Sequence, residues 1–336
     1  MDNQRLILLL VFLFSLFMLW DGWQKHSQPV SAAAIDQTAQ KAAPEIPGVS
    51  PTPTTTLSSA PATSPSSAVP MPAQAAVSAP GVKAVVKTDL YLAEISSVGG
   101  DLVRLELTQH KATEDKTKHF VLMEISKERT YLAQTGLIGE GLPNHKTEFR
   151  LEPRVYELKP DSDKLELRLE APEANGLKVV KIYTFHRGSY QIDVGYEIVN
   201  QRQVPLDAHA YYQLTRDGKV PEAGMTNIAT FTGPAIYTEE GKFQKVDFTD
   251  IEKGKAKFVQ KAKDGWLAVV QHYFVAGWTP QGKEEREFFM RKVADNLFSA
   301  GIILPVGAVA PGQITRIGVP LYAGPQEQAT LEKIAP

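Results

Sequence analysis

A two-residue alternation of apolar and polar side chains recurs through residues 85–336 and restricts the fold more than any other feature. In Tyr190–Ile198, Tyr, Ile and Val occupy every second position, and Gln, Asp, Gly and Glu lie between them. Val103–Thr108 and Leu165–Glu170 repeat the pattern. Successive side chains of a strand point to opposite faces, so each segment is predicted to be a strand with one buried face. Many short strands and few helices favour an all-β fold, an antiparallel sandwich.

Turn residues place two hairpins in this region. Arg187–Ser189 separates Lys178–Phe185 from the strand that starts at Tyr190, and Gly99–Gly100 is predicted to turn an earlier hairpin. Trp266–Trp278 is nearly all apolar and rich in Val and aromatic residues, which predicts one inner strand covered on both faces. His272 lies within that stretch, and we interpret it as a satisfied core imidazole rather than as a catalytic base or a metal ligand.

The end of the chain carries the few signals that interrupt strands or begin helices. A helical turn is considered around Glu284–Arg291, and a short helix is predicted over Gln326–Ile334, with Pro325 at a first-turn position. Prolines are expected to confine the last strands to short pieces. These prolines are Pro305, Pro311 and Pro320.

An apolar run near the N-terminus predicts a membrane segment. Leu6–Trp20 has no charged residue, and its twelve Leu, Ile, Val and Phe side chains favour the bilayer by about 4 to 7 kcal/mol. Extended to Trp23, the helix spans about 27 Å and places Trp20 and Trp23 at headgroup depth, with Arg5 at the opposite interface. Residues 1–23 are therefore predicted to be an uncleaved signal-anchor with a cytoplasmic N-terminus. The alternative is a cleaved signal peptide, whose only suitable site is Ala32–Ala34.

Residues 24–84 are predicted to be a disordered linker. They contain no Phe, Tyr or Trp, and Pro29–Pro80 holds ten of the 23 prolines of the chain. Ala, Ser, Thr and Pro cannot bury enough apolar area to offset the entropy of ordering the segment. A spacer that holds a domain away from the membrane and a neutral filler both fit this composition. The folded domain is predicted to occupy residues 85–324, and a C-terminal helix residues 325–336.

Composition and motifs exclude most kinds of chemistry. The chain has 36 Lys and Arg against 38 Asp and Glu, so its net charge of −2 provides no basic footprint for nucleic acid. The absence of Cys excludes disulfides, thiol catalysis and Cys-ligated metals. No phosphate-binding loop, nucleophile elbow or His-x-x-x-His spacing is present, and Asp161–Asp163 is interpreted as a polar turn rather than a calcium loop. We therefore expect no catalytic residue, no cofactor and no metal, and no enzyme activity.

One lysine-rich stretch is a candidate contact surface. Lys242–Asp264 carries seven lysines against four acidic residues. It fits a contact surface for an acidic partner or for anionic lipid headgroups, and it also fits a solvated loop with an edge strand, which we favour. The candidate residues are Lys242, Lys245, Lys253 and Lys255.

Segments along the whole chain, outside the linker, resemble the YidC membrane protein insertases of the YidC/Oxa family. The opening Met1–Arg5 before the apolar run is similar to the start of Gram-negative members. Further segments resemble the family in the same order: Gly99–Leu102, Tyr131–Leu137, Phe185–Ile192, Phe231–Ala235, Gly265–Phe274, Leu321–Gln326 and Ala335–Pro336.

The resemblance implies an inner-membrane protein with its N-terminus in the cytoplasm and its large domain in the periplasm. That domain is implied to be a β-supersandwich, similar to galactose mutarotase. Five further transmembrane helices would form a hydrophilic groove with an arginine that receives polar parts of incoming proteins. The resemblance also implies partners: inner-membrane lipid, the Sec translocon with its SecDF accessory, and nascent membrane proteins that the insertase integrates and helps to fold.

Three expectations follow for residues 1–336. The five-helix core is expected to be missing after Pro336, so this chain alone is expected not to insert substrates. The C-terminal helix is expected to lead toward that core and to transmit the position of the domain. Its candidate residues are Pro325, Gln326, Leu331 and Ile334.

The alternative function is a membrane-anchored carbohydrate-binding or mutarotase-like protein, which requires a cleft with paired His and carboxylate groups and stacking aromatic rings. A passive assembly scaffold is the third option.

Overall fold

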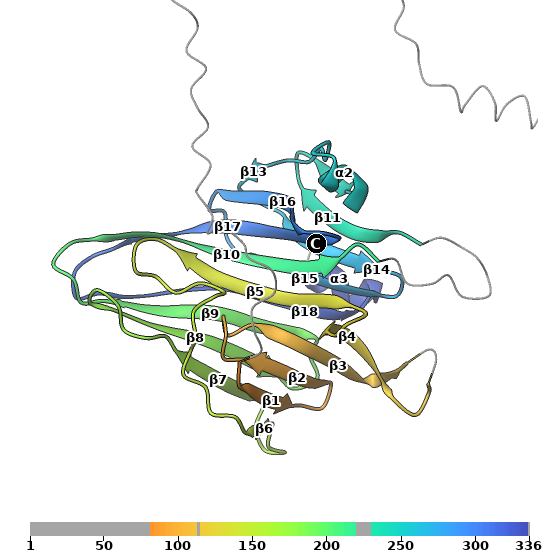
Figure 1. The fold of residues 1–336 in the computed structure, drawn as a ribbon, viewed down its shortest axis with the longest axis horizontal. Helices are drawn as coiled ribbons and strands as arrows, with labels where there is room; N and C mark the ends of the chain where they lie inside the picture. The colour runs from red at the N-terminus through yellow and green to blue at the C-terminus, as the bar shows by residue number, and fades with distance from the viewer. Residues whose placement is uncertain (1–80, 113–114, 220–229, 335–336) are drawn as a thin grey trace, which may run out of the picture. The chain divides into compact units, whose positions relative to one another are not determined.

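The computed structural model describes residues 81–112, 115–219 and 230–334 (Figure 1). The predicted anchor, and the predicted linker up to residue 80, lie outside these ranges. None of the helices in the described residues combines the length and the apolar character that crossing a membrane requires.

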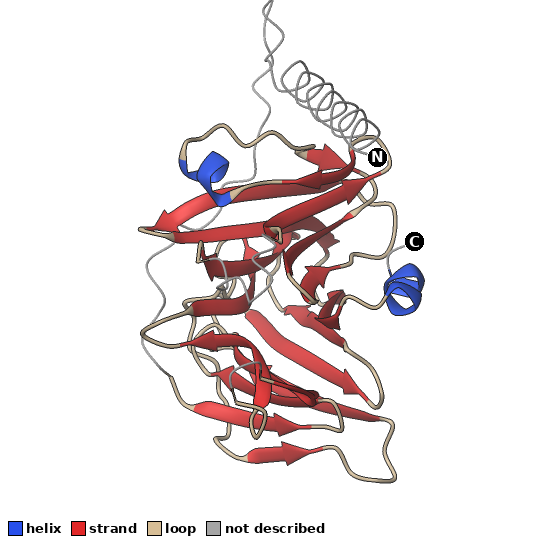
Figure 2. Cartoon of the chain, turned by 90° about the vertical axis from the view of Figure 1, so that its right-hand side faces the viewer, coloured by secondary structure: helices blue, strands red, loops and turns tan. Residues whose placement is uncertain are grey.

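Most of the regular structure in the described residues is strand, arranged in two sheets (Figure 2). The first sheet has ten strands in the order β13 (Lys261–Ala262), β16 (Arg286–Ala294), β17 (Leu297–Val309), β10 (Leu206–Asp217), β5 (Thr130–Ile138), β4 (His119–Ile125), β3 (Leu102–Lys111), β2 (Tyr91–Ser96), β1 (Lys83–Lys87) and β6 (Val155–Glu157). The second sheet has eight strands in the order β12 (Lys242–Lys245), β11 (Thr232–Thr238), β14 (Trp266–Gln271), β15 (Phe274–Trp278), β18 (Ile314–Pro325), β9 (Gln191–Asn200), β8 (Leu177–His186) and β7 (Lys164–Glu170). Two short helices, α2 (Phe248–Glu252) and α3 (Gln328–Ile334), complete the described elements.

The inward faces of the two sheets share one hydrophobic core. In β9, Ile192, Val194, Tyr196 and Ile198 are at most 1% exposed, and the residues between them are half-buried. They join one apolar cluster with side chains of the first sheet such as Leu105. Paired strands run antiparallel, except β1 and β6, which run parallel. The structure thus confirms the all-β antiparallel sandwich with a short C-terminal helix.

Both predicted hairpins are present. β8 and β9 pair antiparallel around Arg187–Ser189, and β2 and β3 pair antiparallel around Gly99–Gly100. Gly99 and Gly100 have φ of +71° and +59°, in the left-handed region that favours glycine. At the N-terminal boundary, β1 begins at Lys83, so the last two residues of the predicted linker belong to a strand, and Ala84 is fully buried.

The single inner strand predicted over Trp266–Trp278 is wrong. The stretch forms two antiparallel strands, β14 and β15, which turn at His272–Tyr273. His272 has φ of +41° and is exposed, so the prediction of a core imidazole is also wrong. The sequence gives no local signal for this turn, because no Gly, Pro or Asn lies at it.

Three predictions near the C-terminus need correction. Glu284–Arg291 contributes to strand β16 and not to a helical turn. β17 and β18 are 13 and 12 residues long and pass through Pro305 and Pro320. Each proline lies where its strand is paired on one side only: β16 pairs with β17 only up to Ile303, and β15 pairs with β18 only from Leu321 onward. On the unpaired side, the backbone N–H that each proline lacks therefore interrupts no hydrogen bonds between strands.

Two proline positions remain. Pro311 lies in the turn between β17 and β18, where a proline is readily accepted. Pro325 is the last residue of β18 rather than the first turn of the helix, and α3 begins at Gln328.

Candidate functional site

The C-terminal helix packs against the outer face of the second sheet. Leu331 and Ile334 are half-buried, and they lie on one face of α3 because residues three apart are on the same side of a helix. Both pack against a cluster of Ala268 in β14, Val275 in β15 and Tyr322 in β18. Leu331 and Ile334, which the sequence placed in the C-terminal helix, therefore attach that helix to the domain.

The segment before α3 is fixed to the β14–β15 turn. The Gln326 side-chain amide donates hydrogen bonds to the carbonyl oxygens of His272 and Phe274 at 2.7 and 3.0 Å. The Gln326 backbone N–H donates to the Tyr273 carbonyl at 2.8 Å. The Tyr322 hydroxyl donates to the Pro325 carbonyl at 2.7 Å. The structure thus brings Pro325, Gln326, Leu331 and Ile334 together in one junction.

A buried phenol links this junction to the first sheet. The Tyr91 hydroxyl of β2 lies 2.8 Å from the Tyr190 carbonyl oxygen and 2.7 Å from the Ala323 carbonyl oxygen, and it donates to one of them at a time. Burial raises the pKa of this phenol well above its usual value, so it remains a donor. Sequence reasoning missed Tyr91, because it precedes Ala323 by 232 residues and no local pattern records that contact.

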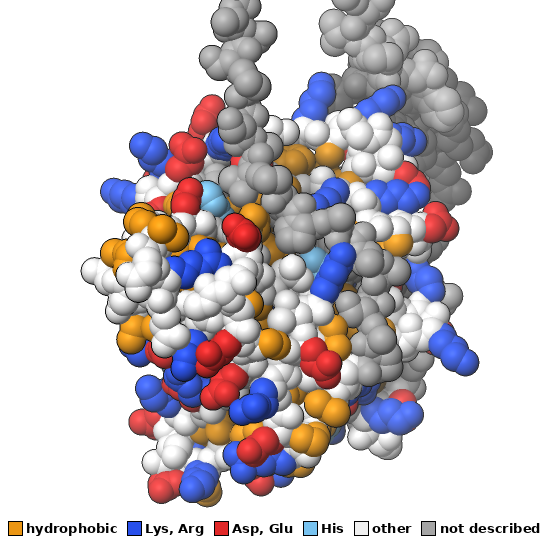
Figure 3. Space-filling view, turned by 60° about the vertical axis from the view of Figure 1, so that its left-hand side comes forward, with side chains coloured by type: hydrophobic (Ala, Val, Ile, Leu, Met, Phe, Trp, Pro, Cys, Tyr) orange, Lys and Arg blue, Asp and Glu red, His pale blue; other side chains and the backbone are white. Residues whose placement is uncertain are grey.

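The predicted lysine surface comes from two separate places. Lys242 and Lys245 belong to the edge strand β12, whereas Lys253 and Lys255 follow α2. All four are exposed, and none forms a salt bridge within the described residues. The face drawn in Figure 3 shows acidic and basic side chains interspersed, without a large area of one sign.

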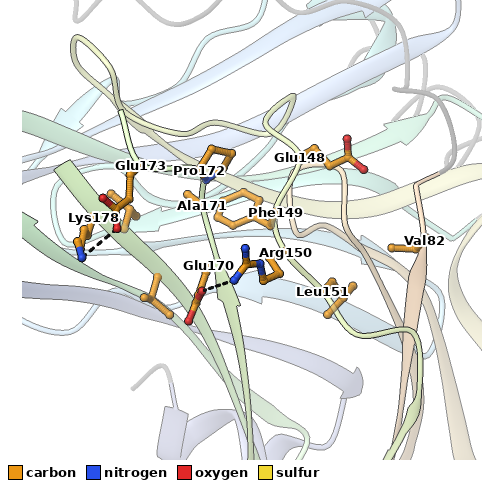
Figure 4. Close-up of a pocket in the computed structure, with 12 residues that line it drawn as sticks. Val82, Glu148, Phe149, Arg150, Leu151, Glu170, Ala171, Pro172, Glu173 and Lys178 are labelled. Atoms are coloured by element: carbon orange, nitrogen blue, oxygen red, sulfur yellow. Dashed lines mark ion pairs between the residues drawn. The ribbon is translucent and has the colours of Figure 1, made fainter. Parts of the chain in front are cut away.

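An open cleft of about 890 Å³ lies between residues 148–151 and the β7–β8 hairpin (Figure 4). Two ion pairs line it: Arg150 lies 3.8 Å from Glu170, and Lys178 lies 2.9 Å from Glu173. These side chains are 47–85% exposed, so the pairs contribute little to stability. The lining of the cleft contains no histidine, and we assign it no chemistry.

One pair of oppositely charged groups with shifted pKa values lies inside the sandwich. Lys181, fully buried, donates to the Gly99 carbonyl at 2.9 Å and lies 3.9 Å from an Asp101 carboxylate oxygen. Gln134 donates to the other carboxylate oxygen at 2.7 Å. Burial raises the pKa of Asp101 and lowers that of Lys181. Both groups are closed off from solvent, so the pair is structural.

The carbohydrate alternative requires a different arrangement. His186 lies 2.7 Å from the Asp193 carboxylate on β8 and β9. Within the described ranges, no aromatic ring contacts His186, and no group of His, Cys, Asp and Glu is arranged to hold a metal ion. This surface pair does not favour a sugar site.

Comparison with known protein families shows which family the chain belongs to. The family model described as "YidC periplasmic domain" matches residues 83–336, from the first residue of β1 onward. The chain belongs to the YidC family. YidC membrane insertases from Aromatoleum aromaticum, Dechloromonas aromatica and Nitrosospira multiformis are 55%, 47% and 45% identical to it over 337, 345 and 343 residues. These alignments cover all of this chain and 59–60% of each relative, so the chain spans about 60% of their length.

Two solved structures of low sequence identity also match the chain. A galactose mutarotase related enzyme from Lactobacillus acidophilus has a TM-score of 0.45 and 9% identity, covering 72% of this chain and 97% of its own. A putative aldose 1-epimerase from Escherichia coli has a TM-score of 0.41 and 11% identity, covering 72% of this chain and 98% of its own. At these scores the likeness supports neither the fold nor a sugar-directed activity.

Proposed function

We propose that this YidC chain supplies the periplasmic module of a bacterial inner-membrane insertase. Residues 1–23 anchor it with the N-terminus in the cytoplasm, and the β body lies in the periplasm. The module serves the integration and folding of inner-membrane proteins, alone or beside the Sec translocon and SecDF. Family membership and the names of the relatives support this proposal. The module acts by binding and positioning, without catalysis of its own.

The docking of α3 is the observation that carries the proposed mechanism. Two half-buried side chains join the helix to the outer face of the second sheet, and Gln326 joins the segment before it to the β14–β15 turn. A helix attached in this way moves with the domain, whereas a flexible segment does not. We therefore propose that α3, rather than the sandwich surface, transmits the position of the domain to the insertase.

Releasing α3 from the sheet is expected to reduce substrate insertion several-fold. The change is Leu331→Ser with Ile334→Ser in the intact insertase. Loss of two half-buried apolar side chains removes about 2 kcal/mol of docking, which lowers the ratio of docked to undocked helix more than tenfold. Insertion of a model substrate into inner-membrane vesicles is the measurement.

The matched control for α3 changes Glu332→Ser and Lys333→Ser, two exposed residues of the same helix. Insertion is expected to be unaffected in this variant. Replacement of Gln326–Ile334 by a flexible linker provides the second test. Unchanged insertion in the linker variant refutes the role of the helix.

We also propose that Lys253 and Lys255 form part of a surface for Sec partners. Both are exposed and unpaired among the described residues. Charge reversal with Lys253→Glu and Lys255→Glu is expected to reduce co-purification of SecDF several-fold. The introduced carboxylates would repel the acidic partner surface that we propose these lysines bind. Lys164→Glu, on the edge strand β7, is the control. Equal co-purification in all three proteins contradicts the assignment.

A further inference from the structure

Three aromatic rings lie side by side at one edge of the second sheet. Phe243 in β12, Tyr237 in β11 and Trp266 in β14 occupy adjacent positions of the strand register. The ring centroids of Tyr237 and Trp266 lie 5.9 Å apart at 17°, and those of Phe243 and Trp266 lie 5.9 Å apart at 49°. Phe243 is 48% exposed, and the other two are half-buried. We call these three residues the ring patch.

A tight turn holds Trp266 in this position. Gly265 has φ of +92°, and a Cβ atom there would lie 2.0 Å from the Tyr237 carbonyl oxygen. Only glycine fits this approach of the two strands. The backbone thus fixes an exposed aromatic surface where an edge strand ordinarily carries polar residues.

The charges around the ring patch nearly balance. Lys242 and Lys245 flank Phe243, and the Lys245 ammonium lies 5.9 Å from its ring centroid. Glu239 and Glu240 are exposed on the adjoining turn, and the Asp264 carboxylate accepts a hydrogen bond from the Glu239 backbone N–H. The net charge at this edge is therefore small, so a contact made here must depend mainly on the aromatic rings.

The ring patch continues into the site where α3 docks. Trp266 packs against the same cluster of Ala268, Val275 and Tyr322 that receives α3. At the other end of β14, Tyr273 is 69% exposed on the turn that Gln326 clamps. One face of the second sheet thus carries α3, with the ring patch at one end of β14 and the exposed Tyr273 just beyond the other end.

We propose that this face rests on the headgroup layer of a phospholipid bilayer, with the ring patch inserted between headgroups. Aromatic rings with a polar edge favour that layer, and the lysines beside them reach phosphate oxygens. Three rings are too small an area for a stable protein interface. A weak contact suffices when an anchor elsewhere in the chain keeps the body beside the membrane. This inference rests on the proposed periplasmic module and adds lipid as the partner of the β12 edge.

The chain has no cysteine, so a single introduced cysteine carries a fluorescent probe in the full chain. The full chain is reconstituted in phosphatidylcholine vesicles, with and without phosphatidylglycerol, that contain a headgroup spin label. A probe at Glu240→Cys, beside the ring patch, is expected to be quenched several-fold more than a probe at Val155→Cys, which is exposed on β6 of the other sheet. The excess is expected in both lipid mixtures and to change less than twofold in 0.5 M salt, because rings rather than charges make the contact.

Two variants separate a lipid contact made by the rings from a contact made by the lysines. In the Glu240→Cys background, Phe243→Ser is expected to lower quenching to the Val155→Cys level, whereas Lys242→Glu with Lys245→Glu retains at least half of the excess. Phe243 is half-exposed, and circular dichroism confirms that its variant remains folded. Equal quenching at the two probe sites overturns the proposal. The proposal is also overturned if salt or charge reversal abolishes the excess quenching at Glu240→Cys, or if that excess appears only when Sec proteins are added. Unchanged insertion in the variant that replaces Gln326–Ile334 by a flexible linker, with the quenching excess intact, instead contradicts the proposed function and leaves the lipid contact standing.

Discussion

Replacing Lys181 with methionine is expected to lower the free energy of unfolding by about 3–5 kcal/mol. Lys181 is fully buried, and its ammonium is the cation beside the buried Asp101 carboxylate, 3.9 Å away. Methionine fills a similar volume but leaves Asp101 unpaired and the Gly99 carbonyl without its donor. Urea denaturation at pH 8 is the measurement. The loss is expected to be smaller at pH 5, because a buried carboxyl without its cation takes up a proton.

A double variant distinguishes loss of charge pairing from loss of packing. Asp101→Asn with Lys181→Met removes both charges and retains an oxygen that accepts from Gln134. It is expected to recover at least 1 kcal/mol relative to Lys181→Met, and to remain below the native protein because the Gly99 carbonyl is still unsatisfied. Equal stabilities of the single and double variants at pH 8 contradict the role of the ion pair.

The sequence was sufficient to predict the fold class, because alternation is a local signal. The same pattern assigns Lys181 an inward position, two residues from Val179 and two from Tyr183, both buried. It could not name the partner, since Asp101 lies on another strand connection 80 residues earlier. Pairing across the sandwich depends on strand order, and no local pattern encodes that order.

The candidate site was predicted in the same partial way. The sequence placed Gln326, Leu331 and Ile334 in one C-terminal helix that leads toward the membrane core, but it did not indicate that Leu331 and Ile334 dock on the sheet. The surface that receives the helix was not predicted, because the turn at His272–Tyr273 carries no turn signal and was interpreted as part of one strand. The neighbours of Trp266 in the ring patch come from β11 and β12, and only the strand register brings them together.

His145 is expected to make stability depend on pH between about 4 and 6.5. Burial, followed by the charges of Lys146, Arg291 and Lys181, lowers the pKa of His145 to about 4. In this window the unfolded chain binds a proton that the folded protein does not, so stability is lost as pH falls below 6.5. Relative to His145→Gln, the native protein is expected to gain about 3 kcal/mol between pH 4 and pH 6.5. Urea denaturation at half-unit pH intervals measures the difference.

Comparison with a variant is essential, because Asp101 contributes the opposite slope. Because the pKa of Asp101 is raised, the folded protein holds a proton that the unfolded chain has already lost. Stability therefore falls as the pH rises above the usual pKa of an aspartate. That term is present in both proteins and cancels in the difference. A flat difference curve between pH 4 and pH 6.5 contradicts the assignment to His145.

The hydrogen bonding of His145 allows the cause of the shift to be tested. The His145 backbone N–H donates to the Tyr211 phenol oxygen at 3.0 Å, so the phenol proton remains for the Nδ1 atom of His145, which contacts the same oxygen. This arrangement suits a neutral imidazole, but burial is the larger cause of its low pKa. Tyr211→Phe is therefore expected to lower stability at every pH while most of the slope that His145 produces persists. Disappearance of that slope in Tyr211→Phe instead makes the phenol, rather than burial, the origin of the pH dependence.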